Sequence, residues 1–257
     1  MLLETTKLSR SFGGVVAVRE VDFEVKEGLI TGLIGPNGAG KTTLFNNISG
    51  LDTPTSGKVF FQGNDITNMS AHRICRLGIA RTFQNIRLFK ELSVLENVMV
   101  GLHFKTGNGP TKGRVAAALR SFLWARAEYE AMYEAAHKWL KFFELDTLQD
   151  ELAKNLPYGH QRELEIARAL ATNPTILFLD EPAAGMNPFE TSSLMDTIRR
   201  IRDLGVTVVL IEHDMKLVMN ICDTITVLNY GEKIAQGTPS EVRHNEKVIE
   251  AYLGKEE

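Results

Sequence analysis

The chain has 257 residues, of which 44% are hydrophobic and 24% charged, and its formal net charge is −3. These values are typical of a globular protein that buries a substantial core, in one large domain or two small ones. Since the charge gives no broadly basic surface, we expect no nucleic-acid partner. No run approaches eighteen apolar residues and no signal-peptide pattern is present, so we expect no transmembrane segment. Cys75 and Cys222 lack nearby metal-binding partners, which indicates reduced thiols in a reducing compartment.

The first β signals lie in the N-terminal sixty residues. Val21, Phe23 and Val25 alternate with charged residues, which predicts one half-buried strand of an antiparallel sheet. Two further strands are predicted at residues 29–34 and 58–62.

A helical region is expected from residue 93 to about residue 170. Ser93 and Glu96 have the spacing of a capping box, and the Ala-, Glu- and Arg-rich run 115–143 predicts one long helix. The polar, Gly-rich stretch 105–113 is expected to form an exposed loop.

The C-terminal third alternates apolar strands with helices. Residues 176–179 and 206–211 are almost entirely apolar, as expected for a parallel sheet that is covered on both faces. A hairpin is predicted at 224–235 with its turn at 229–232, and a helix start is predicted at Thr238.

Residues 35–42, Gly-Pro-Asn-Gly-Ala-Gly-Lys-Thr, match the phosphate-binding pattern G-x-x-x-x-G-K-[ST] and directly follow an apolar strand. Glycines let successive N–H groups converge on phosphates, and the helix that begins near Lys41 adds the positive end of its dipole. Lys41 is expected to reach the β- and γ-phosphates and Thr42 to bind Mg²⁺. A chance Gly-rich turn is the alternative, which the preceding strand disfavours. The motif therefore predicts binding of ATP or GTP.

A second motif of phosphate chemistry follows the apolar strand at 176–179. Asp180 is expected at the sheet edge where the phosphate loop lies, and there it can hold Mg²⁺ directly or through water. Glu181 can polarise a water for in-line attack on the γ-phosphate. A merely solvated carboxylate pair is the alternative, and the phosphate loop makes it the weaker one.

Residues 156–162, Leu-Pro-Tyr-Gly-His-Gln-Arg, open a helix just upstream of this strand. They resemble the signature motif of ATP-binding cassette (ABC) transporter ATPases, usually Leu-Ser-Gly-Gly-Gln. Further family motifs lie on both sides of this segment, in the order usual for the family, and span almost the whole chain. They are an aromatic residue at Phe12, a glutamine at Gln84 and a histidine at His213.

The resemblance implies an α/β fold of the P-loop NTPase class, with an antiparallel β subdomain, a RecA-like parallel-sheet core and an inserted α-helical subdomain. Residues 1–257 would then be a single ABC ATPase domain. Within it, residues 1–85 and 172–257 would form the nucleotide-binding core, and residues 86–171 the helical subdomain with the signature.

The resemblance also implies a role for each matching residue. Phe12 would stack on adenine, Gln84 would link Mg²⁺ to the helical subdomain, and His213 would contact the γ-phosphate. The implied catalytic residues are Glu181, His213, Gln84 and Lys41. The implied nucleotide contacts are Phe12, Gly35, Pro36, Asn37, Gly38, Ala39, Gly40, Lys41, Thr42, Thr43, Tyr158, Gly159 and His160. The implied metal ligands are Thr42, Gln84 and Asp180.

The signature departs from the family pattern. Pro157 stands where serine is usual, so the hydroxyl that the family offers to the partner's γ-phosphate is absent. Tyr158 and His160 replace a glycine and a glutamine. Gly159 remains, and its backbone N–H at a helix N-terminus can still face an anion.

A second departure is Asn187, where many members of the family carry an aspartate that acts across the dimer. Asn187, Pro188 and Glu190 have the pattern of an N-cap, a first-turn proline and a capping-box acid. Helix capping is therefore the first interpretation, and signalling across the dimer is the second.

The Tyr-Gly signature, the segment 181–188 and the enlarged helical region resemble most closely the ATPase subunits of branched-chain amino acid importers. This implies ATP and Mg²⁺ as cofactors and a peripheral location at the cytoplasmic face of the inner membrane. The implied partners are a second ABC ATPase subunit, more often different than identical, two integral-membrane permease subunits and, indirectly, a periplasmic or extracellular solute-binding protein.

Two alternatives stay open. One is the ATPase of a lipopolysaccharide-type ABC exporter. The other is a non-transport ABC ATPase acting on DNA or ribosomes, which the single cassette and the absence of a long coiled-coil insertion disfavour. Residues 103–126 hold five Lys and Arg residues and no acidic residue. A solvated helix face is the first interpretation of this run, and docking to a membrane subunit or to lipid head groups is the second.

Overall fold

The computed structural model describes residues 1–102 and 116–253, and within these it describes only the backbone of 116–128 and 253. The chain divides into two units, Met1–Gln84 with Thr175–Glu257 (unit 1) and Asn85–Pro174 (unit 2). The predicted loop 105–113 and the side chains of the basic run 103–126 lie outside the described residues. No helix in the described ranges is long and apolar enough to cross a bilayer.

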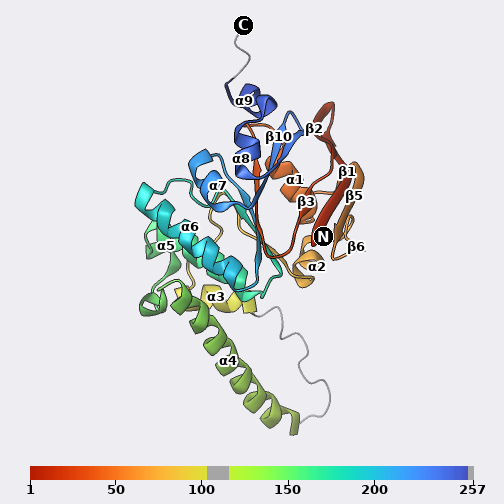
Figure 1. The fold of residues 1–257 in the computed structure, drawn as a ribbon. Helices are drawn as coiled ribbons and strands as arrows, with labels where there is room; N and C mark the ends of the chain where they lie inside the picture. The colour runs from red at the N-terminus through yellow and green to blue at the C-terminus, as the bar shows by residue number, and fades with distance from the viewer. Residues whose placement is uncertain (103–115, 254–257) are drawn as a thin grey trace. The chain divides into compact units, whose positions relative to one another are not determined.

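Unit 1 contains an antiparallel sheet in which the strands follow the order β2-β1-β5-β6, with β3 paired to β1 (Figure 1). Its strands are β1 Leu3–Phe12, β2 Val15–Val21, β3 Glu24–Val25, β5 Ser56–Phe61 and β6 Asn64–Asp65. The single strand predicted at 21–25 is wrong. The Thr5 hydroxyl donates to the Val21 carbonyl (2.8 Å) and accepts from the Phe23 N–H (2.9 Å). Because this side chain takes the place of a strand partner, the chain breaks into β2 and β3 there.

A second sheet of unit 1 has the strand order β11-β10-β4-β9-β8-β7 and is parallel except for β11. Its strands are β4 Ile30–Ile34, β7 Ile79–Arg81, β8 Ile176–Asp180, β9 Thr207–Ile211, β10 Thr224–Asn229 and β11 Glu232–Gly237. Every residue of β8 and β9 is buried, as expected from their apolar runs, and every residue of β4 is buried as well.

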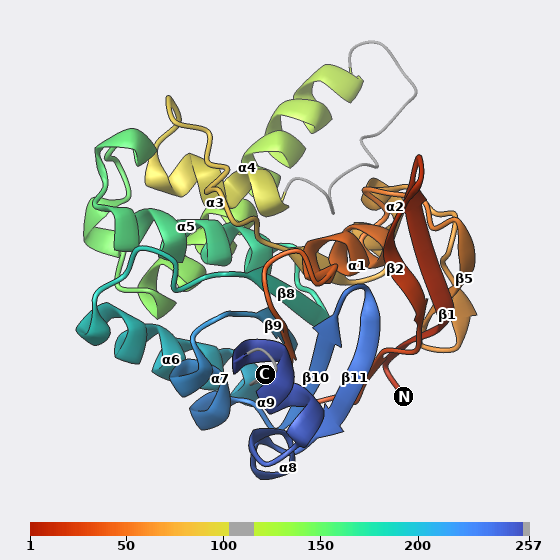
Figure 2. The same cartoon turned by 90° about the horizontal axis from the view of Figure 1, so that it is seen from above.

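Helices cover both faces of this parallel sheet. Figure 2 shows α1 on one face and α6 and α7 on the other. The helices of unit 1 are α1 Lys41–Ile48, α2 Ala71–Arg76, α6 Pro188–Asp203, α7 Met215–Ile221, α8 Pro239–Arg243 and α9 Glu246–Leu253. Phe45 of α1 packs edge-on against Phe178 of β8, with 4.7 Å between ring centroids, in the main core cluster. This packing fixes α1, and with it the loop before α1, against the sheet.

Unit 2 is helical. Its α-helices are α3 Val94–Leu102, α4 Ala116–Phe142 and α5 Tyr158–Ala171, and its 3₁₀ turns are η2 Asp146–Leu148 and η3 Ala153–Asn155. The predicted capping box is confirmed: the Ser93 N–H donates to Glu96 Oε2 (2.8 Å) and the Glu96 N–H donates to Ser93 Oγ (3.1 Å). The helix expected at 115–143 corresponds to α4. α3 packs against both α4 and α5.

Candidate nucleotide-binding site

The loop of residues 35–42 connects β4 to α1, and its backbone requires glycine at two positions. Gly35 has a φ of +150°, and a Cβ there would lie 2.1 Å from the Leu228 carbonyl oxygen. Gly40 has a φ of +96°, and a Cβ there would lie 2.4 Å from the Ala17 carbonyl oxygen. Since side chains rarely adopt such φ values and have no room here, the two glycines are needed for the tight path of the loop.

Lys41 is buried inside this loop. Its Nζ donates to the carbonyl oxygens of Gly35 (2.7 Å) and Pro36 (3.0 Å). Burial lowers the pKa of Lys41, while the nearby carboxylates of Glu181 and Asp180 act in the opposite direction. No side chain caps the N-terminus of α1. Its first N–H groups and the Lys41 ammonium therefore converge on one place where an anion can bind.

A cavity of about 300 Å³ lies at the loop, at the lower end of the range for ligand pockets. It is lined by Ala17, Asn37, Gly38, Ala39, Gly40, Lys41, Thr42, Thr43, Gln84 and Glu181. The fold thus brings Gln84 and Glu181 from distant parts of the sequence to the phosphate loop. Phe12 is not among the described residues that line this cavity. It lies half-exposed at the end of β1, with the Arg10 guanidinium 4.4 Å from the centroid of its ring.

Glu181 is held in one orientation by its neighbours. It adopts a φ of +47°, which is uncommon for a residue with a side chain, and its N–H donates to the Ile211 carbonyl (2.9 Å). Gln84 Nε2 donates to Glu181 Oε2 at 2.8 Å. The exposed His213 places Nδ1 4.0 Å from the same oxygen. A carboxylate, an amide and an imidazole therefore meet beside the phosphate loop.

Asp180 is anchored by Arg81, a residue to which sequence reasoning assigned no role. Arg81 Nη2 donates to Asp180 Oδ2 (2.8 Å), and Arg81 Nη1 donates to Asn46 Oδ1 (2.8 Å) and to Ser49 Oγ (3.1 Å). Arg81 stands in the motif that identified Gln84, but nothing in its spacing indicates Asp180 as its partner. The pairing occupies one oxygen of Asp180 and leaves Oδ1 for another ligand.

Glu212 is a second residue that sequence reasoning missed. It is almost fully buried, and its Oε1 accepts from the Ala183 N–H (2.9 Å) while its Oε2 accepts from the His213 N–H (3.2 Å). Burial raises the pKa of this carboxyl. Glu212 thereby ties the segment after β8 to the segment after β9, and so positions Glu181 and His213 relative to each other.

The predicted metal ligands have the right donor chemistry for Mg²⁺. Thr42 offers a hydroxyl, Gln84 an amide oxygen and Asp180 a carboxylate oxygen, and Mg²⁺ prefers such oxygen ligands. Among the described residues, no group of three His, Cys, Asp or Glu side chains forms a metal-binding cluster.

The predicted signature residues belong to unit 2. Tyr158, Gly159 and His160 form the first turn of α5, and Pro157 at the N-cap provides no side-chain hydrogen bond. The half-exposed Tyr158 hydroxyl accepts from Arg162 Nη2 (3.3 Å). The first N–H groups of α5 therefore lack a side-chain acceptor at the N-cap, as an anion-binding helix start requires.

Asn187 caps α6, as its first interpretation predicted. Its Oδ1 accepts from the N–H groups of Phe189 (2.9 Å) and Glu190 (3.0 Å), and Glu190 Oε2 accepts from the Asn187 N–H (2.8 Å). The capping box is complete.

A glycine loop between a parallel strand and a helix, with a lysine inside it and strand-end carboxylates beside it, defines a P-loop nucleoside triphosphatase. Comparison with known families narrows this class. Residues 18–184 match the family model described as ABC transporter, and residues 232–257 match the model described as branched-chain amino acid ATP-binding cassette transporter. The chain belongs to the ABC transporter ATPase family.

Individual relatives agree with this assignment over their full length. The chain is 47% identical over 255 residues to the high-affinity branched-chain amino acid transport ATP-binding protein BraF of Pseudomonas aeruginosa, covering 99% of this chain and 98% of the relative. It is 45% identical to the corresponding LivG of Escherichia coli K12, with the same coverage. The crystal structure of an ABC transporter cassette in its ADP conformation superposes with a TM-score of 0.84 at 34% identity, covering 99% of both chains. The fold expected from the sequence is confirmed.

Proposed function

We propose that this chain is the ATP-hydrolysing subunit that energises an importer of branched-chain amino acids. The meeting of Lys41, Gln84 and Glu181 around one cavity, with His213 close to Glu181, is the observation that carries the ATPase part. The full-length relatives are named as branched-chain amino acid transport ATP-binding proteins, and this supports the assignment of the transported solute. The match of residues 232–257 to a branched-chain amino acid transporter model supports it as well.

Nucleotide binding uses the loop and its surroundings. Lys41 exchanges the carbonyls of Gly35 and Pro36 for oxygens of the β- and γ-phosphates, and Phe12 stacks on the adenine. The loop from Pro36 to Gly40 and Thr43 supply further contacts, chiefly through backbone N–H groups. Thr42, Asp180 and Gln84 would hold Mg²⁺, which neutralises charge on the phosphates when bound.

Hydrolysis depends on Glu181. Its carboxylate polarises the attacking water, and the hydrogen bond from Gln84 keeps it in the position from which it does so. His213 stabilises charge that develops on the γ-phosphate. Because Gln84 is the last residue of unit 1, its contact with Glu181 is where the nucleotide state can act on the helical unit.

The proposed partners follow from the signature turn of α5, which serves the nucleotide site of another chain. Tyr158, Gly159 and His160 face the nucleotide of a second ABC ATPase chain, which in the assembled importer is a different chain. Two membrane-embedded permease subunits carry the solute path, and an external solute-binding protein delivers the solute. The chain then acts as a peripheral subunit at the cytoplasmic face of the membrane.

Isolation of the tagged chain with its native membrane partners tests this function. We expect two permease chains and a second ATPase in the complex. In vesicles that contain the complex and the binding protein, we expect ATP-dependent uptake of labelled leucine. Uptake should disappear when Lys41→Ala replaces the wild-type chain. A complex without permeases, or with permeases that export a glycolipid, would contradict the proposal.

A further inference from the structure

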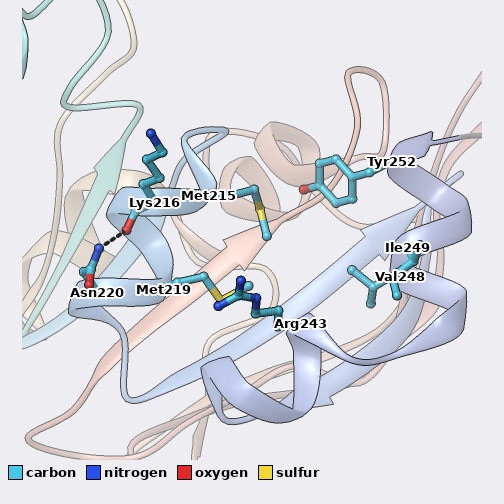
Figure 3. Close-up of a pocket in the computed structure, with 8 residues that line it drawn as sticks. All are labelled: Met215, Lys216, Met219, Asn220, Arg243, Val248, Ile249 and Tyr252. Atoms are coloured by element: carbon cyan, nitrogen blue, oxygen red, sulfur yellow. Dashed lines mark hydrogen bonds between the residues drawn. The ribbon is translucent and has the colours of Figure 1, made fainter.

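A second cavity of unit 1, about 560 Å³ in volume, lies between α7, α8 and α9 (Figure 3). This volume is within the range of ligand pockets. Most of its lining comes from α7 (Met215 and Met219), from the end of α8 (Arg243) and from α9 (Val248, Ile249 and Tyr252). Both α8 and α9 belong to the segment 232–257 that matches the branched-chain amino acid transporter model.

The body of the cavity is apolar. Two thioether side chains from α7 face aliphatic and aromatic side chains from α9 across the space. Ile249 is 44% exposed and Tyr252 37% exposed, so apolar surface remains for a ligand to cover. Methionine side chains adapt to ligands of different shape. An aliphatic group fits this wall best.

Two cationic residues line the cavity, and Arg243 is the one whose charged group lies within it. The Arg243 guanidinium lies beside Met219 (Figure 3) and forms no hydrogen bond or ion pair with any of the described residues. The Lys216 side chain points away from the cavity, and Asn220 Nδ2 donates to the Lys216 carbonyl (2.7 Å). No acidic side chain occurs among the described lining residues. The site therefore favours an anion over a zwitterion, whose ammonium group would find no carboxylate.

The cavity is connected to the nucleotide site through both of its walls. The Tyr252 hydroxyl lies near the backbone of Gly35 in the phosphate loop, and the Gly35 carbonyl accepts from Lys41 Nζ. On the other wall, α7 begins two residues after His213 and is capped by Asp214, whose Oδ1 accepts from the Lys216 N–H (2.8 Å). A ligand that bridges α7 and α9 thus contacts the Tyr252 side chain near Gly35 and the helix that follows His213.

We propose that this cavity binds a small aliphatic monocarboxylate without an amino group, and that its occupancy strengthens ATP binding. The carboxylate pairs with Arg243, and the aliphatic part packs against the two methionines and α9. The bound ligand holds α7 and α9 together, so less conformational freedom is lost when ATP binds. By linkage, ATP must increase the affinity for the carboxylate by the same factor.

Calorimetric titration of the full chain without nucleotide tests the site. The probes are 4-methyl-2-oxopentanoate, octanoate and leucine. We expect saturable binding of at least one of the two acids, and the tighter acid identifies a branched 2-oxo acid or a fatty acid as the source. Leucine should bind at least about tenfold more weakly, because its ammonium group is desolvated without a partner.

Three variants check the location. Arg243→Gln should weaken binding of the acid by about tenfold or more, since a charge-assisted hydrogen bond is lost. Met219→Trp should abolish binding by filling the cavity. Arg73→Gln, an exposed change on α2, should bind as the wild type does. Absence of saturable binding by either acid, or wild-type affinity in both cavity variants, would overturn the proposal.

The coupling is measured by repeating the titration with a saturating, non-hydrolysable ATP analogue. We expect about fivefold tighter binding of the acid. Tyr252→Phe should lose this increase, which is measured as the ratio of the variant's own affinities with and without the analogue. Equal affinities with and without the analogue in the wild type would refute the coupling. This arm rests on the proposed nucleotide site, whereas the titration without nucleotide does not, so the two failures can be told apart.

Discussion

Arg81 and Asp180 form an ion pair in the interior of unit 1, with 2.8 Å between Nη2 and Oδ2 and side-chain exposures of only 7% and 3%. Arg81 is the last residue of β7 and Asp180 the last residue of the neighbouring parallel strand β8. The ion pair therefore lies at the carboxyl ends of these two strands. Both charged groups are largely shielded from bulk solvent. Arg81 holds Oδ2 of Asp180, which leaves Oδ1 for another ligand.

Loss of this pair should destabilise the fold. Arg81→Met leaves a buried carboxylate without a partner, and we expect the free energy of unfolding to fall by about 3–5 kcal/mol. Urea denaturation of the nucleotide-free chain measures it. Arg199→Met is the matched control, because it breaks a pair with Asp196 whose side chains are 39% and 71% exposed. The control should change stability by less than about 1 kcal/mol. Equal effects of the two changes would show that burial does not decide the value of the ion pair.

Removal of the Lys41 ammonium should prevent tight nucleotide binding. In Lys41→Ala the phosphates lose the nearest fixed cation, and we expect ATP affinity to fall by about 100-fold or more. Equilibrium binding of a fluorescent ATP analogue measures the change, and circular dichroism shows whether the fold is kept. Lys26→Ala, at an exposed position, is the control. Wild-type affinity in folded Lys41→Ala would remove the loop from the nucleotide site.

Glu181→Gln should separate binding from chemistry. The amide keeps the size of the side chain but cannot polarise the attacking water, so ATP hydrolysis should fall by about 100-fold or more. Nucleotide affinity should stay near the wild-type value, because Lys41 and Thr42 are unchanged. Phosphate release measures turnover. Size-exclusion chromatography with ATP should reveal an accumulated dimer, formed either by two copies of the variant or by the variant and its natural partner chain.

Glu232→Gln is the control for that experiment, because this exposed carboxylate pairs only with Arg19 at 3.1 Å among the described residues. It should leave turnover unchanged. Near-normal turnover in Glu181→Gln would refute the role of Glu181 and direct attention to His213.

Pro157→Ser should tighten the ATP-bound dimer. It restores the hydroxyl that other family members offer to the partner's γ-phosphate, at an N-cap that now has no side-chain acceptor. Dimerisation is followed by analytical ultracentrifugation with ATP in a Glu181→Gln background. Pro157→Ala also removes the proline ring but adds no hydroxyl, so it should not tighten the dimer. If the serine and alanine variants dimerise equally, the hydroxyl is not limiting.

Features that depend on neighbouring residues were readable from the sequence. The phosphate loop, the capping boxes of α3 and α6 and the largely apolar strands each need only a short stretch of chain, and all of them occur where predicted. The break between β2 and β3 was not readable, because it depends on Thr5, which lies 16 residues before Val21. Local alternation of side chains contains no information about such a partner.

The same limit applies to the site. The motifs pointed to Asp180, Glu181, Gln84 and Lys41, but not to Arg81, which holds Asp180, or to Glu212, which ties together the segments after β8 and β9. Arg81 lies 99 residues before Asp180, and the two meet only because β7 and β8 are adjacent in the sheet. A pairing of this kind becomes visible only once the strand order is known.

The parallel register of β8 and β9 sets Asp180 opposite Ile211, so the residues that follow each strand leave the sheet at the same level. Side chains alternate between the two faces of a strand, so one inserted or deleted residue in β9 would reverse every following side chain. Glu212 and His213 would then turn away from Glu181 although both motifs were intact. The length of this strand therefore matters as much as the identity of the residues at its end. Chimaeras that exchange segments with other cassettes should accordingly place their junctions outside residues 176–213.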